Sequence, residues 1–178
     1  MNLNDYAWNN HEKRLKENNK ITIPSKYKIK IKDDIYLRIK LENLLETFSQ
    51  KMLAEWALLN AKRFIKYIDV SDEHLKKSVI DTAEDIFYKR LNGSVNAYEL
   101  RQVGFLANKL SKESTSDLSK IASRVFAQAI ATGHMRGHAI VSSDYAVKFV
   151  NLEKDNCVDS VVDERNEQLN LAYELKQL

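Results

Sequence analysis

The chain has 178 residues with only one proline and four glycines, which favours long helices in one domain over a fold of strands and turns. Its single cysteine, Cys157, excludes an internal disulfide, and the absence of any run of about 18 apolar residues excludes a membrane-spanning helix. Because the N-terminal residues also lack the apolar centre of a signal peptide, we expect a cytoplasmic protein that does not enter a membrane.

Positive charge is concentrated at the start of the chain. Residues 1–40 contain ten Lys or Arg and five Asp or Glu, whereas residues 41–178 contain 18 and 20. We therefore predict a basic N-terminal arm, 1–40, with a short helix and a linker, followed by a helical domain, 41–178. A basic arm can bind nucleic acid, but nucleic-acid binders usually carry a denser basic stripe and a recognisable motif. A nucleic-acid-binding regulator is therefore only a second alternative.

The stretch from Tyr27 to Leu41 permits two structures. Apolar residues occupy every odd position except Asp33, and this period of two indicates strands. A three-residue turn at 32–34 would place the apolar side chains of a β-hairpin over 27–39 on one face. In the alternative, Asp34 is the N-cap of a helix that begins at Ile35. The pattern allows both.

The rest of the chain has helical periodicity, with apolar residues recurring three and four positions apart. Asn92-Gly93 ends one helix, since glycine suits the left-handed position after a C-terminus, and Asn96 with Glu99 forms the capping-box pattern that begins the next. We predict an all-α fold, an antiparallel bundle or array of five to six helices, to which the hairpin would be a small addition. The main helices cover about residues 42–68, 72–91, 96–110, 118–150 and 158–173.

The least charged long stretch, residues 118–150, contains a histidine pair. On one helix, His134 and His138 lie one turn apart on an apolar stripe that continues to Tyr145. Gly133 and Gly137 lie beside them, and a glycine in a helix interior costs about 1 kcal/mol relative to alanine. We expect either close packing or a break in the helix near Gly133 to offset this cost.

The histidine pair has three interpretations. In the first, the histidines are buried and hydrogen-bonded to a neighbouring helix. In the second, they recognise a partner or ligand, with Tyr145 and Arg165 as further binding candidates. In the third, they bind a metal. Histidines at i and i+4 can supply two ligands from one helix. However, the glutamate of the zincin motif is missing, and a third ligand would have to come from another helix. We therefore predict no metal ligand and no cofactor, with a metal-binding bundle or metal-dependent hydrolase using His134 and His138 as the first alternative.

Two further charged residues have a structural interpretation. Arg165 falls on the apolar stripe of the last helix, which favours an internal pair with a carboxylate. Asp144 has Lys148 one turn further on, so we expect an ion pair within that helix. No P-loop, GxGxxG, GxSxG or CxxC pattern occurs in the chain, and we expect neither catalytic residues nor enzyme activity.

The segment AIATGHMRGHAIVSSDYAVK, residues 129–148, resembles the signature helix of a bacterial family of immunity proteins. Two flanking patterns keep the order of that family, although Glu167 and Asn60 replace its Trp and Cys. The resemblance covers about residues 44–178 and leaves the arm outside. The matching residues are Thr132, His134, His138, Ala139, Tyr145, Ala146 and Lys148 in the signature, Trp56, Ala57 and Ala61 before it, and Glu164, Arg165, Gln168 and Leu169 after it.

This resemblance implies an all-helical cytoplasmic protein that protects its cell by binding a cognate toxin. Such a protein covers the active surface of the toxin and needs no catalysis. The expected partner is therefore a protein, and a homodimer remains open.

Overall fold

Residues 1–177, the part of the chain that the computed structural model describes, contain nine α-helices and one 3-10 turn. No strand occurs in this range, so the predicted all-α class is confirmed. In chain order the helices are α1 (Leu3–Tyr6), α2 (Asn10–Glu17), α3 (Ile35–Glu46), α4 (Gln50–Lys62), the 3-10 turn η1 (Ile65–Tyr67), α5 (Glu73–Leu91), α6 (Ala97–Glu113), α7 (Asp117–Ala131), α8 (Gly137–Glu153) and α9 (Val158–Gln177).

The predicted number of five to six helices is too low because three predicted helices are each divided in two. Polar side chains begin a new helix at two of the divisions: Asn9 accepts a hydrogen bond from the backbone of α2, and Ser49 accepts one from the backbone of α4. The third division lies at 132–136, between α7 and α8. The capping box of Asn96 with Glu99, and the end of α5 before Gly93, agree with the prediction.

The β-hairpin predicted over residues 27–39 is wrong, and the helical alternative is correct. Asp34 caps α3, its carboxylate accepting from the Leu37 N–H at 2.9 Å. Asp33 points inward to Arg165 and so is not part of a turn. Residues 27–33 therefore run as an irregular segment, attached at its end by two hydrogen bonds between the Lys32 backbone and the Asn151 amide. The predicted boundary at residue 40 falls inside α3.

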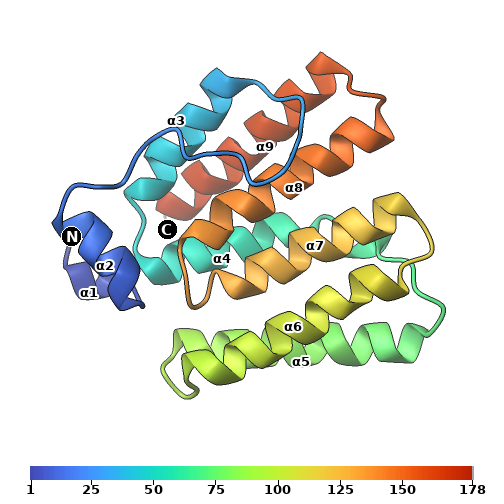
Figure 1. Cartoon of the computed structure of the whole chain (residues 1–178), viewed down its shortest axis with the longest axis horizontal. Coiled ribbons are helices and arrows are strands. Elements are labelled where there is room, and N and C mark those ends of the chain that lie inside the picture. The colour runs from blue at the N-terminus through green and yellow to red at the C-terminus, as the bar shows by residue number, and fades with distance from the viewer. Residues whose placement is uncertain (178) are drawn as a thin grey trace.

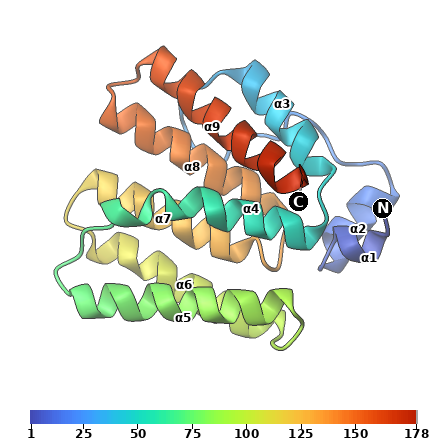
Figure 2. The same cartoon turned by 180° about the vertical axis from the view of Figure 1, so that it is seen from behind.

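The helices form a layered array (Figure 1). α3 and α9 lie at one side, α8 and α4 come next, α7 follows, and α6 and α5 lie at the opposite edge; the reverse view shows the same order (Figure 2). The short helices α1 and α2 cover one end, and the segment from 18 to 34 crosses the face formed by α8 and α9 (Figure 1). Trp56 of α4 is fully buried between these layers, and its indole N–H donates to the Gln168 carbonyl at 3.1 Å.

Residues 118–150 do not form one helix, and Gly133 lies in the break between α7 and α8. A Cβ at this position would lie 2.6 Å from the side chain of Leu100 and 3.3 Å from that of Phe87. α7 ends just before Gly133, where the missing side chain allows close contact with Leu100 and Phe87, so close packing and a break in the helix, the two expected ways of offsetting the glycine cost, both occur. Within residues 1–177, no helix combines the length and apolar character that crossing a membrane requires.

Candidate functional site

A buried chain of alternating charges joins the N-terminal arm to α3, α8 and α9. The guanidinium of Arg38 binds both carboxylate oxygens of Asp144, at 3.0 and 2.9 Å. Arg165 reaches the same carboxylate at 2.8 Å and also holds Asp33 through two donors, at 2.9 and 2.5 Å. Both arginine side chains are completely buried. Glu42, one turn after Arg38, lies at 3.2 Å from it and completes the series.

This arrangement confirms the internal pair predicted for Arg165 and corrects the pair predicted for Asp144. Burial alone lowers the pKa of Arg165, but the carboxylates of Asp33 and Asp144 raise it more, so the net direction is upward. Asp144 faces these arginines, so the ion pair with Lys148 is wrong. A charge network in which every buried group has a partner fixes how helices and arm fit together.

The histidine pair lies where α7 turns into α8. The rings of His134 and His138 are 5.4 Å apart, and both side chains are half-buried. Nδ1 of His138 lies 2.7 Å from the Gln128 amide oxygen, whereas Nδ1 of His134 is buried without a hydrogen-bond partner in the described residues. Burial, followed by the nearby positive charges of His138, Arg101 and Arg90, lowers the pKa of His134 to about 4. Burial also lowers the pKa of His138. At neutral pH the ring of His134 is therefore neutral.

The metal alternative gains no third ligand from the fold. Among residues 1–177 no group of three or more His, Cys, Asp or Glu side chains is placed to hold a metal ion. Tyr145, the remaining binding candidate, is half-buried against the core, with the Arg124 guanidinium 5.9 Å from its ring. The structure thus brings His134 and His138 together but leaves Arg165 in the charge network.

The arm contributes a second set of contacts at the start of α8, which has no cap of its own. The two carboxylate oxygens of Glu12 accept from the backbone N–H groups of Arg136 and Gly137, each at 2.9 Å. A carboxylate suits this place because a helix N-terminus carries unsatisfied N–H donors and partial positive charge. Burial raises the pKa of Glu12 even though these hydrogen bonds oppose the change.

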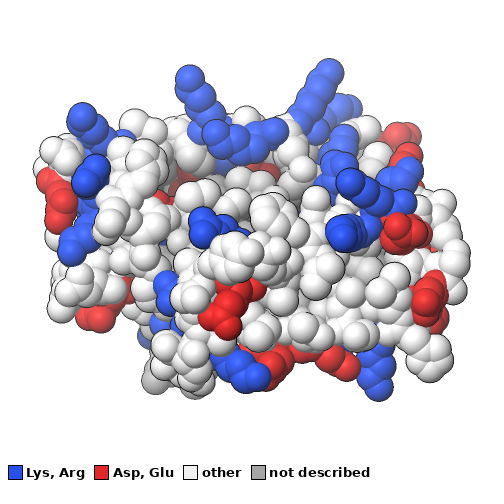
Figure 3. Space-filling view, turned by 60° about the horizontal axis from the view of Figure 1, so that its bottom comes forward, with Lys and Arg blue, Asp and Glu red and all other residues white. Residues whose placement is uncertain are grey.

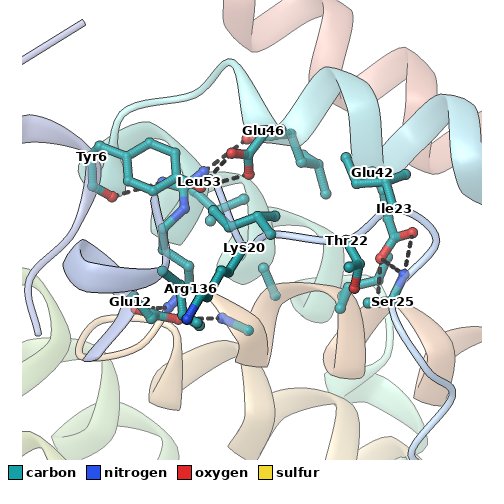
Figure 4. A pocket seen from close by; sticks show the side chains of 16 residues that line it. Tyr6, Glu12, Lys20, Thr22, Ile23, Ser25, Glu42, Glu46, Leu53 and Arg136 are labelled. Atoms are coloured by element: carbon teal, nitrogen blue, oxygen red, sulfur yellow. Dashed lines mark hydrogen bonds between the residues drawn. The ribbon is translucent and has the colours of Figure 1, made fainter. Parts of the chain in front are cut away.

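The side chain of Arg136 also attaches the start of α8 to the neighbouring segments. Its guanidinium donates to the carbonyl oxygens of Tyr6, Phe48 and Leu45, at 2.9, 3.1 and 3.0 Å, and stacks on the Tyr6 ring. Figure 4 shows Tyr6, Glu12 and Arg136 along one wall of a cavity, with Glu42 and Ser25 further along it.

This cavity has a volume of about 290 Å³ and lies between the arm and the body of the protein. Small-molecule sites usually occupy about 300–1,000 Å³, so the space is at the lower limit for a ligand. Its three carboxylates already have partners: Glu12 binds backbone N–H groups, Glu42 binds Ser25 and Arg38, and Glu46 binds Tyr6. The wall therefore offers mainly aliphatic surface, from Leu15, Ile21, Ile23, Leu45, Leu53 and Ile140.

Several of these residues escaped the sequence prediction. Arg38 lies three and seven residues before the buried Leu41 and Leu45, so the stripe argument that placed Arg165 inside would also have placed Arg38 there. Glu12 and Arg136 are far apart in sequence, and no local pattern links a carboxylate of one helix to the backbone of another.

Comparison with known proteins gives one match. The model of a family described as "Imm-5 like putative immunity protein" matches residues 43–175. The chain belongs to this family. No curated protein and no solved structure matches it.

The family match begins within α3, so it includes Asp144 and Arg165 but not Asp33 or Arg38. The residues that carried the resemblance lie mostly in the core: Trp56, Ala146 and Gln168 are completely buried. In this chain, the residues that match the family signature therefore serve mainly to pack the helices. The surface that meets a partner has to be found separately.

Proposed function

We propose that this member of the family is an immunity protein that binds a cognate toxin and covers its active surface, without catalysing a reaction. The observation that carries the proposal is the family match over residues 43–175. The proposed partner is a toxin encoded by a neighbouring reading frame.

The interior of the protein supports binding over chemistry. Asp144 binds both Arg38 and Arg165, and the two histidines are half-buried where α7 meets α8. A protein that acts by occlusion needs a rigid surface more than a reactive group, and a satisfied buried network supplies rigidity. A standard interface covers about 800 Å² of each partner. The solvent-accessible surface of this protein is 9490 Å², so such an interface would cover less than a tenth of it.

Co-expression tests this function. The C-terminal domain of the protein encoded beside this gene is expressed from an inducible promoter, alone and together with the full-length chain. We expect growth arrest with the domain alone, growth with both, and a stoichiometric complex in size-exclusion chromatography. Asp144→Asn, which weakens the core, serves as the control for folding, and it should protect only to the extent that it remains folded. Failure of the stable wild-type protein to bind or to protect would reject the proposal for this toxin.

A further inference from the structure

Large apolar side chains are exposed to solvent on the outer face of α6. Tyr98 and Phe105 are 62% and 63% exposed, and Leu106 is 41% exposed. Tyr98 and Phe105 are seven residues apart, so they lie two turns apart on the same side of the helix. The opposite side of α6 is buried through Leu100, Val103, Ala107 and Leu110. Grouped apolar side chains on a soluble surface mark an interaction site, whereas single ones are ordinary.

The position of α6 leaves this face accessible to another molecule. α6 packs against α5 and α7, and together with α5 it forms the edge opposite α3 and α9 (Figures 1 and 2). With this edge turned forward, the surface is largely uncharged, with groups of Lys and Arg and groups of Asp and Glu scattered over it (Figure 3). A convex helix at an edge can enter a groove, which a flat or recessed face cannot do.

The exposed charges that α6 itself carries beside the two aromatic rings are mostly positive. Arg101, Lys109 and Lys112 are exposed, and none of them forms an ion pair with residues 1–177. The carboxylate of Glu99 is used in the capping box at the start of the helix, which leaves Glu113 at the other end. The face thus has an apolar centre and a cationic border, the distribution that interfaces use for affinity and for steering.

We infer that α6 inserts Tyr98 and Phe105 into an apolar groove with an acidic border on the toxin, an inference that rests on the proposed function. The face from Tyr98 to Lys112 is about 21 Å long at 1.5 Å per residue, which sets the length of the groove. Tyr and Arg are enriched among the residues that dominate binding energy, so Tyr98, Arg101 and Phe105 form the centre of the contact. Lys109 and Lys112, at the border of the contact, increase the rate of association with the toxin.

Charge decides between a toxin and a second copy of this chain. Pairing two α6 helices would bring the cations of both copies together, and like charges across an interface oppose binding. The same argument limits the class of toxin. A cleft that binds nucleic acid is itself positively charged. The surface that α6 covers is therefore one with acidic groups, and it is not the substrate cleft of a nuclease.

The test measures binding of the toxin domain used for the proposed function by surface plasmon resonance, with full-length variants. Phe105→Ala and Tyr98→Ala should each weaken binding at least about thirtyfold, mainly through faster dissociation. The matched control is Tyr36→Ala on α3, because Tyr36 is 82% exposed, and it should change binding less than about threefold. All three side chains are mostly exposed, so none of the variants should lose its fold.

Charge variants test the border separately. Replacing Lys109 and Lys112 by Glu should slow association about tenfold at low salt, with a smaller effect as salt is added. The control replaces Lys40 and Lys51 by Glu, since both are exposed, lie on α3 and α4, and have no ion pair in the described residues. This control gives the same change in net charge, so equal slowing by both pairs would contradict a specific border.

The outcomes separate this inference from the proposed function. If the wild-type protein binds the toxin domain and Phe105→Ala binds it with the same affinity, the α6 interface is overturned and the immunity function is left intact. Absence of wild-type binding would overturn both. Sedimentation analysis supplies the remaining outcome: a wild-type dimer that Phe105→Ala converts to a monomer would show that α6 meets a second copy, and would overturn the acidic groove.

Discussion

The strongest stability prediction concerns Asp144, whose carboxylate lies between two buried arginines. Asp144→Asn keeps the shape of the side chain but removes its charge, and its new N–H₂ donor faces guanidinium donors. The carboxylate accepts three charged hydrogen bonds, at 2.8 to 3.0 Å, from Arg38 and Arg165. Breaking one member of a buried ion pair costs about 3–5 kcal/mol, because the remaining charges stay desolvated. We expect a loss of about this size, or roughly 10 °C in melting temperature for a chain of this length.

Urea unfolding followed by far-UV circular dichroism measures this loss, with an unchanged m-value showing that the unfolding transition still exposes the same surface. The control is Asp85→Asn, whose exposed pair with Lys89 should contribute less than about 0.5 kcal/mol. A double-mutant cycle with Arg165→Met should give a coupling energy of about 1 kcal/mol or more. A loss below about 1 kcal/mol for Asp144→Asn, or additive effects in the cycle, would refute the assignment of a desolvated charge network.

Three further predictions test the packing and the arm. Gly133→Ala should destabilise the protein by about 1–3 kcal/mol, because the new methyl group would lie 2.6 Å from the Leu100 side chain. Gly104→Ala, whose methyl group would have nothing within 4 Å, should instead stabilise the protein by about 0.4–1 kcal/mol. Thermal unfolding of the two variants measures the difference. The folded protein holds the pKa of His134 near 4, below the ordinary 6.5, so the unfolded chain binds more protons between these values and stability should fall as pH is lowered from 6.5 to 4. The His134→Gln variant should show a shallower fall over this range in urea titrations, and an identical slope would contradict the assignment. Glu12→Gln should weaken the cap on α8 by about 0.5–2 kcal/mol, seen as faster hydrogen exchange of the first amides of that helix, and unchanged exchange there would argue against the cap.

The existence of the main helices was predictable because their signals are local. A capping box at Asn96 and a left-handed glycine at Gly93 depend on residues a few positions apart, and both patterns acted as the sequence indicated. The breaks between helices were harder to predict. Periodicity continues across 132–136, and the contacts at the break, the approach of Leu100 to Gly133 and the Glu12 cap on α8, come from residues distant in the sequence.

Residues 27–39 show how tertiary contacts choose between two local patterns. Alternation of apolar residues favours a hairpin, whereas Asp34 favours a helix start, and the two signals are of similar strength. Asp33 distinguishes the two structures. Its carboxylate forms an ion pair with Arg165, some 130 positions further along the chain, so it is not available for a hairpin turn. Asp34 is then free to cap α3, and Arg38 is carried to Asp144 one turn later.

The charge network also determines what the arm can do. Glu12 caps α8, Asp33 binds Arg165, and Arg38 binds Asp144, so the arm completes the core of the family domain although it lies outside the family match. Removing residues 1–40 would take Asp33 from Arg165 and Arg38 from Asp144, which would leave these two with only each other, and it would leave the first N–H groups of α8 without an acceptor. A truncated chain would therefore lose stability before it lost any contact with a toxin. Because exposed Tyr98 and Phe105 take part in none of these internal contacts, substitutions there separate binding from folding in a way that changes in the arm cannot.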